Sequence, residues 1–391
     1  MNNNIYKCIN LAIFIILSSI FYFFISCSPS KEYLIKQNKT AGIDRLHIRV
    51  LLKKESGRVL ISSKTRMKIS EVKSGKILYD GHGKDMYFQS DQVSRPILIE
   101  SWGSPLNVDK ERYRGMIEIH NVVGKLYIIN VIRINEYLYG VVPCEIISTW
   151  DIESLKAQAV AARTYTYYHL INNKKSIYDL DCSNNFQVYK GFNAEKDATN
   201  TAVDETSGKI AIYSGKPILA FFHSTCGGKT MDNNHVWEGE KHDYLKSVSC
   251  KFCNDSPYYT WETNLSLYEI RESLSKKYRG VGKITGINFQ WKDKRVISAV
   301  IRHSKNTIIK LSGNDLRMLF PEKKIKSMHF TAKKTKDGLI LSGHGWGHGV
   351  GLCQWGAKGM AEKGANYKDI LKYYYRGISI MDAGQNDYAG R

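Results

Sequence analysis

The chain has 391 residues, and 57 Lys and Arg against 37 Asp and Glu give it a net charge of +20. Hydrophobic residues make up 43% of it, with 25 Tyr and 7 Trp, which excludes a disordered protein because so many aromatic side chains need a packed core. With 7 Pro and 31 Gly, the composition also excludes a Pro-rich stalk and a collagen-like chain. We expect two or three domains, or one large domain with an appended lobe.

The N-terminal segment, residues 1–27, has the pattern of an export signal. Lys7 is its only charge, and its apolar run is short for a membrane-spanning helix. Ser26 before Cys27 resembles a bacterial lipobox, in which the cysteine becomes the acylated N-terminus. We expect lipidation at Cys27, attachment to a membrane through that lipid, and a polar tether over 28–43; the alternative is an uncleaved membrane anchor. In both cases the rest of the chain works in the cell envelope, outside the cytoplasm.

The positive charge favours an anionic partner of the envelope over nucleic acid. Lys and Arg are scattered, as in 323–326 and 333–336, and no nucleic-acid motif accompanies them. An exported protein meets anionic lipids and cell-wall polymers instead. We therefore predict no nucleic-acid partner.

An α+β fold is predicted from the order of the periodic segments. Residues 44–131 form a β-rich lobe whose short alternating segments are separated by Gly-containing turns. The expected strands are Leu46–Leu52, Lys76–Tyr79, Pro96–Ile99, Met116–Ile119 and Leu126–Val131. The remainder, 132–391, is predicted to form one catalytic region with an inserted β meander.

The clearest predicted helix of that region runs from Asp151 to Leu170 and is rich in small residues that permit close packing. Asp151 is placed to cap it. The elements expected after it are strands at 209–213 and 217–223, a helix at 265–278, a β meander at 284–291, 295–303 and 307–311, and helices at 352–363 and 366–375. Gly364 and Gly377 stand in C-cap positions of the last two helices.

The first segment that carries chemistry is Asn135–Ile146, which contains Glu145 in a predicted loop before the helix. Its apolar neighbours would raise the pKa of this carboxyl group and suit it to general-acid catalysis, whereas the following helix N-terminus favours the ionised form. The alternative is a cap or an ion-pair partner.

The second segment, Ser342–Ala357, has Gly at every second position from 343 to 351. In an extended conformation one face would be bare backbone, while Trp346 and His348 would project from the other face and could contact a sugar polymer. The alternative is close packing against another backbone segment.

Together these segments resemble the signature blocks of the SpoIID/LytB family, which comprises sporulation stage II protein D and amidase-enhancer proteins. The similarity extends over about residues 45–380. The matching blocks are Val141–Ile146, Leu155–Tyr165, Gln187–Tyr189, Phe222–Thr230, Leu311–Arg317 and Gly347–Ala357.

The resemblance implies peptidoglycan chemistry. SpoIID proteins are lytic transglycosylases that cut glycan strands without peptide stems, and their catalytic acid corresponds to Glu145. Such an enzyme needs only one acid/base group, because the sugar's own 6-hydroxyl attacks the anomeric carbon and leaves a 1,6-anhydro end. Asp151, Asp179 and Asp181 remain open as partners. The expected glycan contacts are Arg163, Gln187, Tyr189, Trp346, His348 and Gln354, and Tyr165 and His344 are open between glycan contact and packing.

A cysteine-rich segment predicts a structural Zn²⁺ site. Cys250 and Cys253 form a C-x-x-C pair, and His223 with Cys226 forms an H-x-x-C pair before it. Some SpoIID proteins carry a two-His, two-Cys zinc site near the Gln-Val-Tyr block, where this chain has Cys182, so the fourth ligand is His223 or Cys182. The alternative is disulfide formation.

Cys144 and Cys353 stand where the family often has Ser. If both blocks line one cleft, these thiols could pair, but two small buried residues are the simpler interpretation.

Two other functions are compatible with the sequence to different degrees. A non-catalytic module that enhances a cell-wall amidase is the stronger alternative, because the family contains such proteins. A zinc hydrolase is disfavoured, because three Cys ligands leave no open catalytic position. The sequence also lacks the G-x-S-x-G and H-E-x-x-H motifs of esterases and metalloproteases.

Overall fold

The computed structural model describes residues 47–172, 177–182, 186–305, 307–320 and 324–383. The predicted signal, Cys27 and the predicted tether lie outside these ranges. Within them, no helix combines the length and apolar character that spanning a membrane requires.

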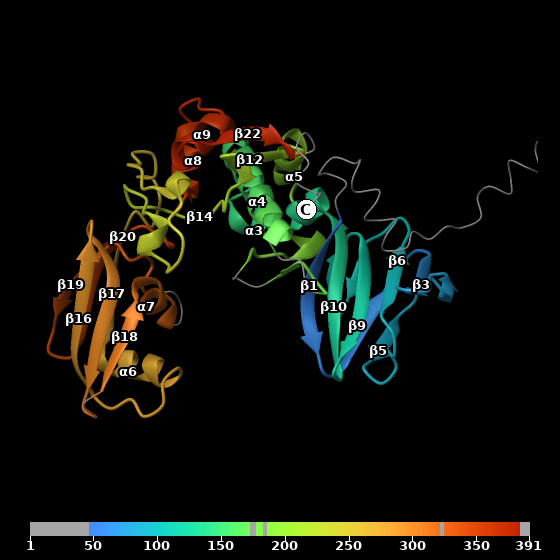
Figure 1. Cartoon of the computed structure of the whole chain (residues 1–391), viewed down its shortest axis with the longest axis horizontal. Helices are drawn as coiled ribbons and strands as arrows, with labels where there is room; N and C mark the ends of the chain where they lie inside the picture. Colours follow the sequence, from blue (N-terminus) through green and yellow to red (C-terminus); the bar gives the residue numbers. More distant parts are fainter. Residues whose placement is uncertain (1–46, 173–176, 183–185, 306, 321–323, 384–391) are drawn as a thin grey trace, which may run out of the picture.

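The described residues form the predicted α+β fold, with a β lobe at each end and helices between them (Figure 1). The helices are α3 (Ile134–Glu145), α4 (Ile152–Asn172), α5 (Asp197–Glu205), α6 (Leu267–Ser275), α7 (Gly313–Leu319), α8 (Gln354–Ala361) and α9 (Tyr367–Tyr374).

The N-terminal lobe contains a seven-stranded and a four-stranded sheet, with strand orders β11-β1-β10-β9-β6-β3-β4 and β5-β2-β7-β8. Alternating apolar residues such as Ile48 and Val50 are fully buried, as a two-residue period requires. Its strands are β1 (His47–Glu55), β2 (Arg58–Ser62), β3 (Met67–Glu71), β4 (Ile77–Gly81), β5 (Met86–Gln89), β6 (Ile97–Ser101), β7 (Leu106–Val108), β8 (Glu111–Tyr113), β9 (Met116–Val122), β10 (Lys125–Arg133) and β11 (Leu180–Asp181).

Helix α4 forms the centre of the molecule. It packs against α3, α5, α8, α9 and strand β12. Residues from Ala157 to Ala162 are fully buried, because small side chains let neighbouring elements approach the helix closely on all sides. Strands β12 (Lys209–Tyr213), β13 (Lys216–Pro217) and β22 (Ser379–Asp382) form a three-stranded sheet beside it.

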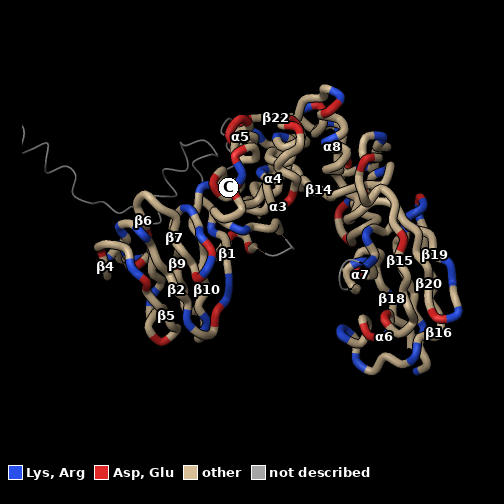
Figure 2. Tube along the Cα trace, turned by 180° about the vertical axis from the view of Figure 1, so that it is seen from behind, with Lys and Arg blue, Asp and Glu red and all other residues tan. Residues whose placement is uncertain are grey.

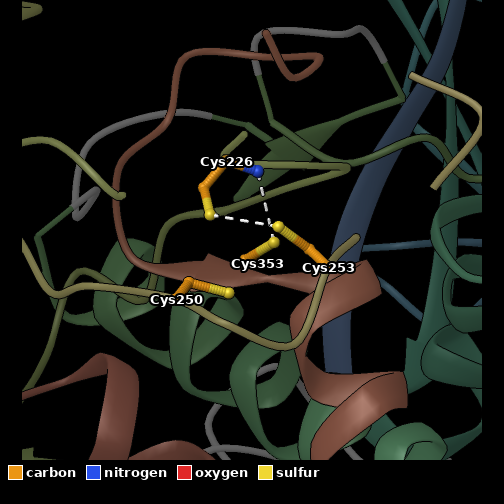
Figure 3. Close-up of side chains that lie close together, drawn as sticks. All are labelled: Cys226, Cys250, Cys253 and Cys353. Atoms are coloured by element: carbon orange, nitrogen blue, oxygen red, sulfur yellow. Dashed lines mark hydrogen bonds between the residues drawn. The ribbon is translucent and has the colours of Figure 1, made fainter. Parts of the chain in front are cut away.

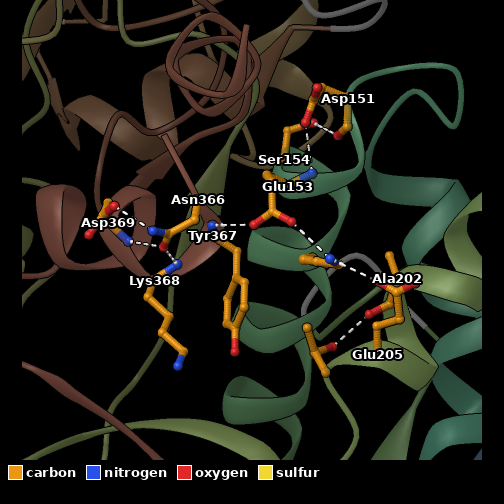
Figure 4. Close-up of polar contacts among 11 residues, drawn as sticks. Asp151, Glu153, Ser154, Ala202, Glu205, Asn366, Tyr367, Lys368 and Asp369 are labelled. Carbon is orange, nitrogen blue, oxygen red and sulfur yellow. Dashed lines mark hydrogen bonds and ion pairs between the residues drawn. The ribbon is translucent and has the colours of Figure 1, made fainter. Parts of the chain in front are cut away.

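The start of α4 is fixed by polar contacts with two other helices (Figure 4). Asp151 Oδ1 accepts a hydrogen bond from the Glu153 amide at 2.8 Å, as its predicted capping role requires. Glu153 Oε2 accepts from the Tyr367 amide at the start of α9, at 2.7 Å. Lys156 forms ion pairs with Glu153 at 2.8 Å and with Glu205 of α5 at 2.7 Å. The segment between Glu145 and α4 is therefore anchored at its C-terminal end.

The C-terminal lobe consists of two three-stranded sheets, α6 and α7. The predicted meander is present as the antiparallel sheet β16-β17-β18, and the other sheet has the order β15-β20-β19. Ser266 and Glu269 form a capping box at α6. The strands are β15 (Thr260–Ser266), β16 (Ile284–Lys292), β17 (Arg295–His303), β18 (Ile308–Ser312), β19 (Phe330–Lys334) and β20 (Gly338–His344). Between this lobe and the helices, β14 (Phe222–His223) pairs in parallel with β21 (Leu352–Cys353).

Candidate functional site

Glu145 is the last residue of α3, so the prediction of a loop at this position is wrong. Its half-buried side chain accepts a hydrogen bond at Oε1 from the Val188 amide, at 3.0 Å. Its backbone carbonyl accepts one from Gln354 Nε2 at the start of α8, at 2.9 Å. Three segments that are far apart in the sequence therefore meet at Glu145.

Two tyrosines lie in the electrostatic field of Glu145. Burial, and then the charge of Glu145, raise the pKa of Tyr165 to about 12 and raise the pKa of Tyr137 further. Both phenols therefore stay protonated at neutral pH. Asp181 acts on the same two tyrosines, which places its carboxylate in the same neighbourhood.

The other two open carboxylates have structural contacts. Asp179 forms an ion pair with Arg49 at 2.9 Å, and Asp151 caps α4. Of the three acids that the sequence left open, Asp181 is the one that shares with Glu145 an electrostatic influence on Tyr137 and Tyr165.

A pair of tryptophans lies next to the Glu145 segment. Trp150 and Trp355 meet edge to face with 4.8 Å between ring centroids, and both are half-buried. Lys358 Nζ lies 5.5 Å from the centroid of the Trp355 ring. The candidate glycan contacts chosen from the sequence include neither ring, although Trp150 stands five residues after Glu145 and Trp355 directly after Gln354.

A second group of rings extends from Tyr165. Its centroid lies 6.0 Å from that of Phe221, which stacks on Trp237 at 4.5 Å. The His348 ring lies 5.0 Å from that of Trp237. Phe221 and Trp237 are both half-buried. Aromatic faces of this kind can stack on sugar rings.

His348 is held by two hydrogen bonds to the backbone. Its Nε2 donates to the Phe222 carbonyl at 2.9 Å, and its Nδ1 accepts from the Val350 amide at 3.1 Å. Burial lowers the pKa of the ring well below its usual range, so the imidazole is neutral. The ring centroids of Trp346 and Tyr258 lie 4.1 Å apart. The backbone of Trp346 forms an isolated antiparallel β-bridge with that of Thr225.

Four of the predicted glycan contacts are buried, which contradicts direct contact with a polymer in this structure. Arg163 is fully buried and donates to the Val203 carbonyl at 2.9 Å. Tyr189 is 5% exposed and donates to Asn130 Oδ1 at 2.8 Å. The other two are Gln187 and Gln354, at 2% and 7% exposure. Gln187 accepts from Thr166 Oγ1, and Gln354 donates to Glu145 and to Gln158. Their polar groups hold the protein together rather than reaching into solvent.

The Gly-rich block is a looped segment, so the prediction of an extended strand with one bare face is wrong after His344. Its four glycines Gly345, Gly347, Gly349 and Gly351 all have positive φ, between 70° and 111°. A Cβ on Gly351 would lie 2.1 Å from the Phe221 carbonyl oxygen. The alternation of glycine therefore serves close packing against 221–227.

Four cysteines lie close together, although they come from β21, from the segment after β14 and from the C-x-x-C loop (Figure 3). The Sγ atoms of Cys226, Cys250, Cys253 and Cys353 all lie within 4.8 Å of one another, and all four residues are buried.

Cys353 is the fourth member of this group, so the expectation of His223 or Cys182 is wrong. His223 Nδ1 lies 3.0 Å from the Val350 carbonyl oxygen, and Cys182 donates to the Leu52 carbonyl in the N-terminal lobe. Cys144 donates to the Gly140 carbonyl and does not pair with Cys353.

A cavity of about 980 Å³ lies in the C-terminal lobe. Tyr259, Trp261, Trp291 and His344 are among its lining residues, and Glu145 is not. His344 therefore belongs to this cavity and to contacts with His329.

The chain resembles several known proteins over about two thirds of its length. A family model described as stage II sporulation protein matches residues 123–213. Stage II sporulation protein D of Bacillus subtilis is 35% identical over 66% of this chain and 78% of its own length. This chain belongs to the SpoIID/LytB family.

The other matches differ in how much of the relative is covered. An uncharacterized protein of Brachyspira hyodysenteriae is 38% identical over 66% of this chain and 69% of its own length. The amidase enhancer of Bacillus subtilis is 30% identical over 62% of this chain but only 40% of its own length. A second model, a domain of unknown function, matches 251–351, which includes most of the C-terminal lobe. The SpoIID model thus covers α3, α4 and Val188, the elements around Glu145.

Residues of both charges occur throughout the described parts of this SpoIID/LytB chain. Figure 2 shows Lys and Arg interspersed with Asp and Glu over both β lobes. The scattered placement of Lys and Arg that the sequence indicates is therefore also seen along the described chain.

Proposed function

We propose that this protein is a peptidoglycan lytic transglycosylase that cleaves the MurNAc–GlcNAc bond of glycan strands, with Glu145 as its acid and base. The observation that carries the proposal is the position of Glu145, whose carboxyl group accepts a hydrogen bond from the Val188 amide and whose backbone carbonyl accepts one from Gln354 Nε2. In the family this glutamate is the catalytic acid. Membership of a cell-wall-related family and the exported, lipid-anchored state predicted at Cys27 both favour an envelope polymer as substrate.

The reaction needs one carboxyl group in two successive roles. The protonated Glu145 gives its proton to the glycosidic oxygen as the C1–O bond of MurNAc breaks, which releases GlcNAc with a free hydroxyl. The resulting carboxylate then takes the proton of the MurNAc 6-hydroxyl while that oxygen bonds to C1, which forms the 1,6-anhydro ring and restores the acid. No water is consumed.

The surroundings of Glu145 suit this chemistry. The hydrogen bond from the Val188 amide orients the carboxyl group, and Tyr165 supplies a neutral hydroxyl nearby. The half-buried residues Trp150, Trp355 and Trp237 are the aromatic candidates for contact with sugar rings.

The test compares the purified full-length chain with Glu145→Gln on stem-free glycan strands and on intact peptidoglycan, with mass spectrometry of the products. Glu136→Gln, at the other end of α3, is the matched control. We expect anhydro-ended fragments from the parent and the control, and a loss of rate of at least about 10²-fold in Glu145→Gln. Reducing ends would instead identify a hydrolase and would contradict the proposal.

The second candidate is a non-catalytic enhancer of a cell-wall amidase, which the similarity to an amidase enhancer favours. In that case the chain binds peptidoglycan without producing fragments and increases the release of peptide stems by an added amidase. Glu145→Gln would leave this stimulation unchanged.

A further inference from the structure

The four-cysteine group has the geometry of a tetrahedral metal site. Zn–S bonds of about 2.3 Å in a tetrahedron place the sulfur atoms about 3.8 Å apart. The Sγ atoms of Cys226 and Cys253 are 3.6 Å apart, and all four sulfurs lie within 4.8 Å of one another. The four residues are at most 2% exposed, so one ion could bind all of them without water.

Neighbouring groups donate hydrogen bonds toward these sulfur atoms. Cys353 Sγ accepts from the Cys226 amide at 3.2 Å and from the Gly356 amide at 3.4 Å. The Tyr374 hydroxyl lies 3.2 Å from Cys250 Sγ. Cys353 is also the N-cap of α8, where the positive end of the helix favours a thiolate. Such donors are typical of the surroundings of metal-bound thiolates.

The buried side chain of Arg295 independently favours a negatively charged group beside Cys226. Its side chain is 3% exposed, and its Nη2 donates to the carbonyls of Cys226 at 2.7 Å and Lys229 at 2.5 Å. Among the described residues the charged groups that act on it are the thiols of Cys226 and Cys353, and no carboxylate is among them. A buried cation requires a compensating charge. One Zn²⁺ with four thiolates carries a net charge of about −2 and would provide this compensation next to Cys226.

The backbone leaves space for the site at Gly356. A Cβ on this residue would lie 2.8 Å from Cys250 Sγ and 1.9 Å from Tyr374 Oη. Glycine is therefore required for α8 to approach the cysteines.

We infer that Cys226, Cys250, Cys253 and Cys353 bind one structural Zn²⁺. Four thiolates leave no open coordination position, so the ion stabilises the fold and takes no part in the chemistry. It joins the C-x-x-C loop to the start of α8, where Gln354 follows Cys353 and holds the Glu145 carbonyl. The metal thereby fixes the helix that positions Glu145. Metal binding itself does not rest on the proposed function.

The first experiment measures metal by mass spectrometry in the full-length chain purified without chelator, together with a count of free thiols. We expect about one zinc per chain. Cys353→Ser and Cys253→Ser should each lose it, whereas the matched controls Cys144→Ser and Cys182→Ser should retain it.

A second measurement keeps the inference testable if these variants fail to fold. The parent chain, with its zinc exchanged for Co²⁺, should show the absorption of a tetrahedral tetrathiolate site, and a chelator should lower its melting temperature. Two disulfides among the four cysteines without metal would overturn the inference, as would iron in place of zinc or zinc retained in Cys353→Ser. Glu145→Gln should contain zinc like the parent, so failure of the proposed activity and failure of the metal site are distinguishable.

Discussion

Gln354→Leu tests whether the C-terminal block holds Glu145 in position. Gln354 Nε2 donates to the Glu145 carbonyl at 2.9 Å and to Gln158 Oε1 at 3.2 Å. Leucine fills a similar volume but leaves two buried acceptors without a donor. Each buried acceptor that loses its hydrogen-bond donor costs about 1–2 kcal/mol. With two such acceptors, we expect the free energy of unfolding to fall by about 2–4 kcal/mol.

The same change should slow catalysis. A displacement of Glu145 of about 1 Å can cost on the order of 10²-fold in rate, so we expect kcat to fall about 10- to 100-fold with little change in KM. Denaturant unfolding followed by helical circular dichroism gives the stability, and the rate of anhydro-end formation gives kcat.

Two further variants test whether Gln354 positions Glu145. The double variant Gln158→Leu/Gln354→Leu removes one stranded acceptor, so it should recover about 1 kcal/mol relative to Gln354→Leu. In a Glu145→Gln background, Gln354→Leu should not lower the residual rate further. A Gln354→Leu chain that is destabilised but has unchanged kcat would refute the positioning role.

The remaining predictions concern buried groups. Arg163→Met removes the donor from four acceptors, on Asn135, Val203, Thr206 and Lys209, and should lower the free energy of unfolding by about 3–4 kcal/mol without raising the KM for glycan; unchanged stability with a raised KM would contradict its burial. Gly356→Ala places a Cβ 2.8 Å from Cys250 Sγ and should lower both the melting temperature and the metal content of the purified chain. Because the pKa of His348 is lowered in the folded state, the unfolded chain binds its proton first, so stability should be fully present above about pH 6.5 and fall below it. His348→Gln, which removes the acceptor for the Val350 amide, should show a shallower pH slope in denaturant midpoints; an equal slope would assign the effect to other groups.

Elements with a consistent local pattern were predictable from the sequence. Helix α4 was expected from Asp151 to Leu170 and runs over Ile152–Asn172, because small and apolar residues with a capping Asp all favour the same structure. Helix α3 was missed because Gly140 and Pro143 lower the helix propensity of Ile134–Glu145. Gly140 is present for tertiary reasons, since a Cβ there would lie 2.7 Å from the Tyr189 ring.

The Gly-rich block shows why a period of two is ambiguous. Glycine at alternate positions agrees equally with a bare strand face and with a loop that takes positive φ at every second residue. Positive φ from Gly345 to Gly351 establishes the second case, and the contact of Gly351 with the Phe221 carbonyl explains it. Only the partner segment 221–227 decides between the two, and it lies more than 100 residues away in the sequence.

The cysteine group was only partly predictable for the same reason. The C-x-x-C spacing identifies Cys250 and Cys253, because both ends of one short loop can reach one ion. Cys353 lies 100 residues later, and no local spacing connects it to them. It reaches the group because β21 pairs with β14 and brings the start of α8 beside Cys226.

Several residues of the signature blocks are buried and have a structural role in this protein. Four residues of these blocks form hydrogen bonds with other groups of the protein through their polar side-chain atoms. They are Arg163, Gln187, Tyr189 and Gln354. Their hydrogen bonds connect α3, α4, the Val188 segment and α8, which are the elements that meet at Glu145. The blocks therefore describe a scaffold around Glu145, and under the proposed function the glycan would be recognised by side chains other than these four. If so, replacing Trp355 or Trp237 by Ala should raise KM while leaving stability and Zn²⁺ content close to those of the parent chain.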